Sequence, residues 1–161
     1  MIRLTRISDY GIVLMTELAA RGDQEPRNAR QVATAAGLPL PVVRKILKVL
    51  TREGLLASHR GSKGGYSLAR SPEQISAAEM IAALDGPISL TECATHSGLC
   101  EQEASCRVRE PWKRINTVVH HALNSVTLAE LARPALDNAA HHVDTIPLSS
   151  LGLYAPERAE P

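Results

Sequence analysis

Residues 29–53 hold the pattern that most constrains the fold: two helical segments separated by a short turn. The stretch 29–36 is predicted to form a short helix that ends at Gly37, a residue suited to the position after a helix. A longer helix is predicted over 41–53, because Pro41 suits a first helical turn and Gly54 follows the last one. Two short helices joined this closely form a helix-turn-helix.

A glycine-tipped hairpin is predicted directly after the second helix. Residues 55–60 and 66–69 have strand character, and Gly61-Ser62-Lys63-Gly64-Gly65 lies between them. A helix-turn-helix followed by such a hairpin is the arrangement of a winged helix-turn-helix.

The charge distribution favours a polyanionic partner for this half of the chain. Residues 1–70 carry 12 Lys or Arg and 5 Asp or Glu, a net charge of +7, although the whole chain of 161 residues is only +1. Hydrophobic residues make up 44%, enough for a packed core, and no apolar run approaches the ~20 residues that span a bilayer. We therefore expect a cytoplasmic protein without a membrane partner. Uneven solvation of the two halves is the alternative explanation of the charge asymmetry, and charge alone does not decide between the two.

One face of the predicted 41–53 helix is cationic. Val43, Ile46, Leu47 and Leu50 recur at the spacing of an inward stripe. The residues that then face outward, and that we expect to bind double-stranded DNA, are Val42, Arg44, Lys45, Lys48 and Arg52. Arg44 and Lys45 lie where such a helix reaches base edges, and Lys48 and Arg52 suit phosphates. In the hairpin, Arg60 or Lys63 suits a phosphate or a minor groove.

Helices are also predicted outside this unit. Residues 8–20 have buried-helix periodicity, with Ser8 or Asp9 as the cap, and Ser76 to Glu79 match a capping box. A helix is predicted over 111–125, and its apolar seam predicts a homodimer, with packing inside one chain as the alternative. The seam consists of Trp112, Ile115, Val119, Ala122 and Val126.

The expected fold class is mainly α with a small β-hairpin wing, as a winged helix-turn-helix domain plus a long dimerisation helix. The expected organisation assigns 1–86 to the DNA-binding domain and 87–107 to a cysteine-containing loop. Dimerisation helices would occupy 108–142, and a frayed tail 143–161.

All three cysteines lie in one short stretch, spaced Cys93-x6-Cys100-x5-Cys106. The spacing differs from the C-x2-C pairs of structural zinc sites, and three soft thiolates suit an iron–sulfur cluster. Three unligated thiols are the alternative. No phosphate-binding loop, metalloprotease or nucleophile-elbow motif is visible, so we expect no enzyme.

Two sets of motifs resemble a known family. Arg3-Leu4-Thr5, Asp9-Tyr10-Gly11, Arg60-Gly61 and Gly64 to Ala69 are similar to the Rrf family of bacterial winged-helix regulators, which includes the iron–sulfur regulator IscR and the nitric-oxide sensor NsrR. Gly86 to Cys93, Cys100, Cys106 and Trp112 to Asn116 more closely resemble its SUF-system branch. The resemblance covers roughly residues 2–132.

The resemblance implies a homodimer that binds a pseudo-palindromic operator. It also implies a 2Fe-2S or 4Fe-4S cluster, held by Cys93, Cys100 and Cys106, that changes operator affinity. Where IscR relatives have a ligating His this chain has Arg109, which cannot ligate iron. Asp9 matches the aspartate that NsrR relatives supply from the partner subunit; its alternative role is a helix cap, and His96 is a further candidate ligand.

The function implied is repression, or dual regulation, of SUF iron–sulfur assembly genes. One alternative is a nitric-oxide or redox sensor that uses the same cluster. Other classes are a cluster or zinc carrier that binds no operator, and a small thiol enzyme.

Overall fold

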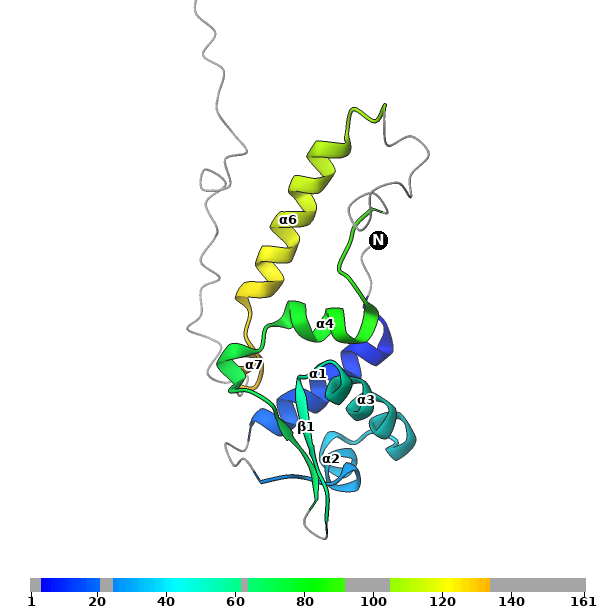
Figure 1. Cartoon of the computed structure of the whole chain (residues 1–161), viewed down its shortest axis with the longest axis vertical. Helices are drawn as coiled ribbons and strands as arrows, with labels where there is room; N and C mark the ends of the chain where they lie inside the picture. The colour runs from blue at the N-terminus through cyan, green and yellow to red at the C-terminus, as the bar shows by residue number, and fades with distance from the viewer. Residues whose placement is uncertain (1–3, 21–24, 62–63, 92–104, 134–161) are drawn as a thin grey trace, which may run out of the picture.

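The computed structural model describes residues 4–20, 25–61, 64–91 and 105–133. Helices dominate, and the described part holds a single two-stranded sheet, β1 paired with β2 (Figure 1). The elements are α1 (Arg6–Ala19), α2 (Ala29–Ala36), α3 (Leu40–Arg52), β1 (Leu56–His59), β2 (Gly65–Leu68), the 3-10 helix η1 (Pro72–Gln74), α4 (Ala77–Asp85), α6 (Arg109–Ser125) and α7 (Leu128–Leu131). The predicted fold class, mainly α with a hairpin wing, is confirmed.

An aliphatic core is shared by helices α1, α2, α3, α4 and α7 and by the base of the hairpin. Its members with no exposed surface are Leu14, Met15, Val32, Val43, Ile46, Leu47, Leu50, Ile75, Met80 and Leu128. Burying one such side chain fully contributes roughly 1.5–3 kcal/mol. The core therefore fixes the orientation of α3 relative to α1 and α4.

The ends of α2 and α3 follow from local chemistry. Asn28 and Gln31 form a capping box at the start of α2, and Gly37 ends it in the left-handed region at φ 65°. Pro41 lies in the first turn of α3, and Gly54 follows its end at φ 74°. The predicted helices 29–36 and 41–53 therefore agree with the structure to within one residue at each end.

The predicted cap of the first helix is wrong. Thr5, not Ser8 or Asp9, is the N-cap, and its hydroxyl accepts a hydrogen bond from the Ser8 amide at 3.3 Å. Ser8 is buried. Asp9 is exposed in the first turn, where the helix dipole favours a negative charge.

The hairpin is an antiparallel pair whose register runs from Leu56 opposite Leu68 to His59 opposite Gly65. The segment before α2 adds a further bridge, because the Arg27 amide donates to the Tyr66 carbonyl at 3.0 Å and the Tyr66 amide donates to the Arg27 carbonyl at 2.8 Å. A Cβ on Gly65 would collide with the backbone of Arg27. Gly65 is therefore needed for the hairpin to lie against the chain that enters α2.

Helix α6 rises away from this body and is attached at its base, beside α4 (Figure 1). None of its residues is buried. It ends at Ser125, so the prediction that places Val126 in the helical seam is wrong: Val126 is extended and packs against the core. No described helix combines the length and apolarity needed to span a membrane.

Candidate nucleic-acid interface

Helix α3 carries its cations on the face opposite its buried stripe. Val43, Ile46, Leu47 and Leu50 have no exposed surface, whereas Arg44, Lys45 and Lys48 are exposed. Within the described ranges, no ion pair engages Arg44, Lys45 or Lys48. Because the buried stripe locks the helix in place, these three side chains project from a rigid support.

Two of the predicted DNA-binding residues on α3 differ from the rest. Arg52 is exposed, but its Nε lies 2.9 Å from Glu53 Oε1, so its charge is already partly engaged. An exposed pair of this kind is worth about 1 kcal/mol at most, and a phosphate can compete for the arginine. Val42 is half-buried against the core, which leaves it less contact surface than the prediction assumes.

The wing presents one described cation, Arg60, which is exposed just after β1. Lys63, the other predicted wing residue, lies outside the described residues. His59 Nε2 is 2.8 Å from Ser67 Oγ across the hairpin, which ties the two strands together next to Arg60.

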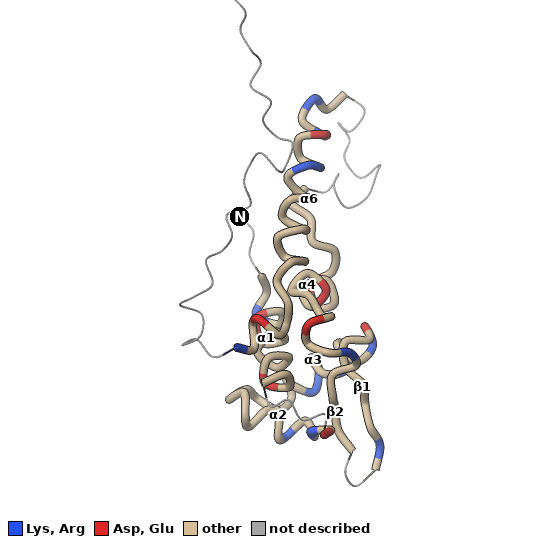
Figure 2. The backbone as a smooth tube through the Cα atoms, turned by 90° about the vertical axis from the view of Figure 1, so that its left-hand side faces the viewer, with Lys and Arg blue, Asp and Glu red and all other residues tan. Residues whose placement is uncertain are grey.

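Sequence reasoning missed Arg30, an exposed cation in the first turn of α2. It lines a shallow groove with Arg27, Asn28, Gln31, Thr34 and Ala35. Figure 2 shows Lys and Arg along α2 and α3 and at the outer end of β1. The sequence does contain a signal for Arg30 as a candidate phosphate contact. The first helix of a helix-turn-helix crosses the DNA backbone, and Arg30 is the only cation within 29–36.

Of the predicted cluster ligands, the structure describes Cys106 and Asp9. Cys106 is a half-buried free thiol just before α6, and Cys93 and Cys100 lie outside the described residues. Asp9 lies on α1, and both views place α1 in the body and the start of α6 at the far tip (Figures 1 and 2). Among the described residues, no group of three His, Cys, Asp or Glu comes together.

The predicted dimerisation face is apolar and open. Trp112 is 39% exposed and Ile115 45%, large values for such side chains. Ala122 is exposed and Val119 half-buried. These four residues lie on one side of α6.

Two helices at a tight turn, a cationic second helix and a hairpin wing define the class of winged-helix DNA-binding proteins. The comparisons with known proteins narrow this class. The model of the Rrf2 family, described as an iron-dependent transcriptional regulator, matches residues 4–134. This chain therefore belongs to the Rrf2 family of DNA-binding transcriptional regulators.

Individual relatives agree with the family match. Protein rrf2 of Nitratidesulfovibrio vulgaris is 30% identical over 134 residues, which cover 83% of this chain and 89% of the relative. IscR of Vibrio cholerae is 30% identical over 130 residues, with 81% and 75% covered. The structure of CymR, the global cysteine regulator of Bacillus subtilis, is similar at a TM-score of 0.65 and 32% identity, with 82% and 97% covered. Because both IscR and CymR are similar to this chain, the SUF branch stays a prediction.

Proposed function

We propose that this regulator is a homodimer that represses its target genes by binding a pseudo-palindromic operator. The observation that carries the proposal is the exposed cationic face of α3, opposite its buried stripe, where no ion pair within the described ranges engages Arg44, Lys45 or Lys48. Arg44 and Lys45 would read base edges in the major groove, while Lys48, Arg52 and the wing residue Arg60 would contact phosphates. A protein that acts on the chromosome of a bacterium works in the cytoplasm.

The dimer is proposed to form through α6. A second copy related by a two-fold axis would cover the same apolar face on both chains, Trp112, Ile115, Val119 and Ala122. The exposed fractions of Trp112 and Ile115 support this, since burying them twice in one interface removes a large apolar area from water. Two chains would also present two α3 helices, as a palindrome requires.

We further propose that an iron–sulfur cluster is the sensory ligand. Its ligands would be Cys93, Cys100 and Cys106, with Asp9 of the partner subunit as the fourth. The donor set fits, since thiolates are the usual cluster ligands. Cys106 is free and partly accessible. Asp9 is exposed on α1, which lies in the body, whereas α6 starts at the far tip (Figure 1), and this arrangement favours donation from Asp9 to another chain. When bound, the cluster supplies a link between the loop of one chain and α1 of the other.

The proposed targets are the SUF iron–sulfur assembly genes. The support is the resemblance of Gly86 to Cys93 and of Trp112 to Asn116 to that branch. A nitric-oxide or redox sensor would use the same ligands, so the two differ in the signal that removes or modifies the cluster.

The experiment that tests the ligand set is anaerobic purification of single variants. Cys93→Ala, Cys100→Ala and Cys106→Ala should each remove the visible charge-transfer absorbance, and Asp9→Ala should keep it but shorten its lifetime in air. Glu17→Ala, at a half-buried acid elsewhere on α1, is the matched control for Asp9. Full absorbance in all three cysteine variants would refute the cluster, and an unchanged lifetime in Asp9→Ala would refute the fourth ligand.

A further inference from the structure

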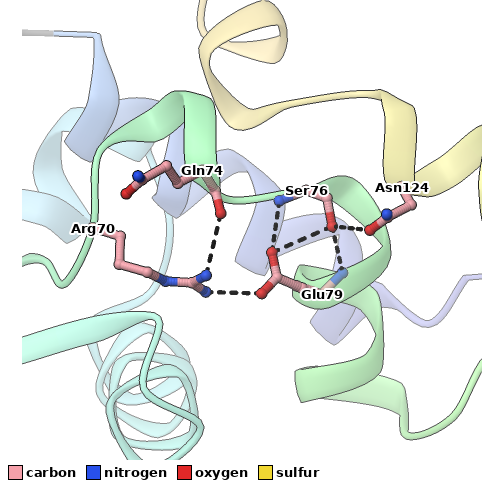
Figure 3. A network of polar contacts seen from close by, with 5 residues as sticks. All are labelled: Arg70, Gln74, Ser76, Glu79 and Asn124. Atoms are coloured by element: carbon pink, nitrogen blue, oxygen red, sulfur yellow. Dashed lines mark hydrogen bonds and ion pairs between the residues drawn. The ribbon is translucent and has the colours of Figure 1, made fainter.

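A polar cluster at the start of α4 receives contacts from Arg70, which follows the wing, and from Asn124 on the distant helix α6 (Figure 3). Glu79 Oε1 lies 2.8 Å from Arg70 Nη2, and Arg70 Nη1 donates to the Gln74 carbonyl at 3.2 Å. Arg70 comes two residues after β2, so it connects the base of the wing to α4. Burial would raise the pKa of Glu79, but the Ser76 amide and Arg70 outweigh it and lower the pKa below its ordinary 4.5.

The Ser76 hydroxyl stands between this ion pair and α6. Its Oγ lies 2.9 Å from Asn124 Oδ1, in the last turn of α6, and 3.3 Å from Glu79 Oε2. A hydroxyl has one proton, so it donates to one of these acceptors at a time. Ser76 itself is 7% exposed, so its hydroxyl proton goes to one of these two side chains instead of to water. The hydroxyl therefore has two discrete arrangements.

Backbone bonds hold the C-terminal end of α6 at the same place. The Ala77 amide donates to the Val126 carbonyl at 2.8 Å, and the Leu128 amide donates to the Ile75 carbonyl at 2.8 Å. The remainder of α6 has no buried residue and extends away from the body. A change in the orientation of α6 would therefore act on the contacts at the start of α4.

We propose that Ser76 and Glu79 form a joint that couples the orientation of α6 to the wing, with Asn124 and Arg70 as the positioning residues on its two sides. The inference rests on the proposed function, in which the dimer has two states with different operator affinity. With α6 in one orientation, Ser76 donates to Asn124 and Glu79 is left to Arg70. With α6 moved away, the Ser76 proton turns to Glu79 Oε2, draws negative charge away from Oε1 and so weakens the pairing of Arg70 with Oε1 at the base of the wing.

The test compares Asn124→Ala and Arg70→Gln with Gln74→Ala, a control in which the contact is made by the backbone and is retained. Operator affinity is measured with and without the cluster. If the wild type changes affinity by the 5–150-fold that is typical of coupled sites, both variants should reduce the change to about twofold or less. The control should keep it. A variant that retains the full wild-type change would overturn the joint while leaving the proposed function intact.

A second readout needs no cluster. The Ala69 amide, at the end of the wing, donates to the Leu55 carbonyl at 3.1 Å. Asn124→Ala should speed its hydrogen exchange by about fivefold or more in the cluster-free protein, because the base of the wing opens locally. Exchange equal to that of Gln74→Ala would overturn the joint, whether or not the wild type responds to a cluster.

Discussion

The carboxylate of Asp85 accepts two hydrogen bonds from Thr5, one from the amide at 3.2 Å and one from the hydroxyl at 2.6 Å. Thr5 caps α1 and Asp85 ends α4, so the contact joins helices whose residues lie 80 positions apart. It also places a negative charge at the positive end of the α1 dipole. Asp85 immediately precedes the segment that leads to the cysteines.

The first prediction concerns the pH dependence of stability. Burial would raise the pKa of Asp85, but the hydrogen bonds from Thr5 outweigh it and lower the pKa below its ordinary 3.8. A depressed folded-state pKa stabilises the protein above 3.8, and this contribution is lost as the pH falls through the folded-state value. Asp85→Asn should therefore lower the free energy of unfolding by about 1 kcal/mol at pH 7. The expected loss is this small because Asp85 is exposed and solvent screens its charge. Urea unfolding should show this deficit shrinking below pH 4.

Glu73→Gln, a change at an exposed acid of η1, is the control. If the loss in free energy of unfolding of Asp85→Asn were the same at pH 7 and below pH 4, the charge of Asp85 would not stabilise the fold.

The second prediction concerns the wing. Gly65→Ala places a methyl group against the Arg27 backbone and forces the hairpin away from the entry to α2. We expect a loss of roughly 1–3 kcal/mol in stability, the range for overpacking, and faster exchange of the Tyr66 amide. Ser58→Ala, at an exposed position in the same hairpin, should change neither. Unchanged Tyr66 exchange in Gly65→Ala would mean that the contact with Arg27 is dispensable.

The third prediction separates base readout from phosphate contact on α3. Arg44→Ala should cost roughly 1–3 kcal/mol on the preferred operator and relax the preference at one position. Lys48→Ala should weaken all duplexes alike and reduce the slope of log affinity against log salt by about 1. Titrations over a salt series on matched and scrambled duplexes measure both quantities. Equal weakening on every sequence in Arg44→Ala would make Arg44 a phosphate contact.

The fourth prediction concerns the dimer. Ile115→Glu buries a charge on each side of the proposed seam and should raise the dimer dissociation constant by roughly tenfold or more, equivalent to at least about 1.4 kcal/mol. Thr117→Glu adds the same charge two residues on, on another side of α6, and should leave the constant unchanged. Sedimentation equilibrium reports both. If the two variants dissociate alike, the apolar face of α6 is not the interface.

The winged helix could be predicted because its signals are local. Gly37 and Gly54 end helices through their own backbone conformation, and Ser76 and Glu79 cap α4 within four residues. The cap of α1 was placed wrongly for a reason that is also local. Helical periodicity continues through Ser8, so the pattern does not reveal that the helix starts earlier, at Arg6, with Thr5 as its cap.

The contacts that connect the elements could not be predicted. Ser76 and Asn124 are 48 residues apart, and Thr5 and Asp85 are 80 apart, so no sequence period relates them. Val126 continues the seam in sequence, but its backbone is extended and its carbonyl accepts a hydrogen bond from the Ala77 amide, so it is not part of the helix. Tertiary packing decides these positions.

We propose that an iron–sulfur cluster controls how tightly the dimer holds its operator. The most direct measurement is an anaerobic titration of the operator with the cluster-loaded protein and with the same preparation after cluster removal, at one stated salt concentration. We expect dissociation constants that differ by at least about fivefold between the two forms. If the colourless, iron-free protein bound the operator as tightly as the cluster-loaded protein, the cluster would not control operator binding.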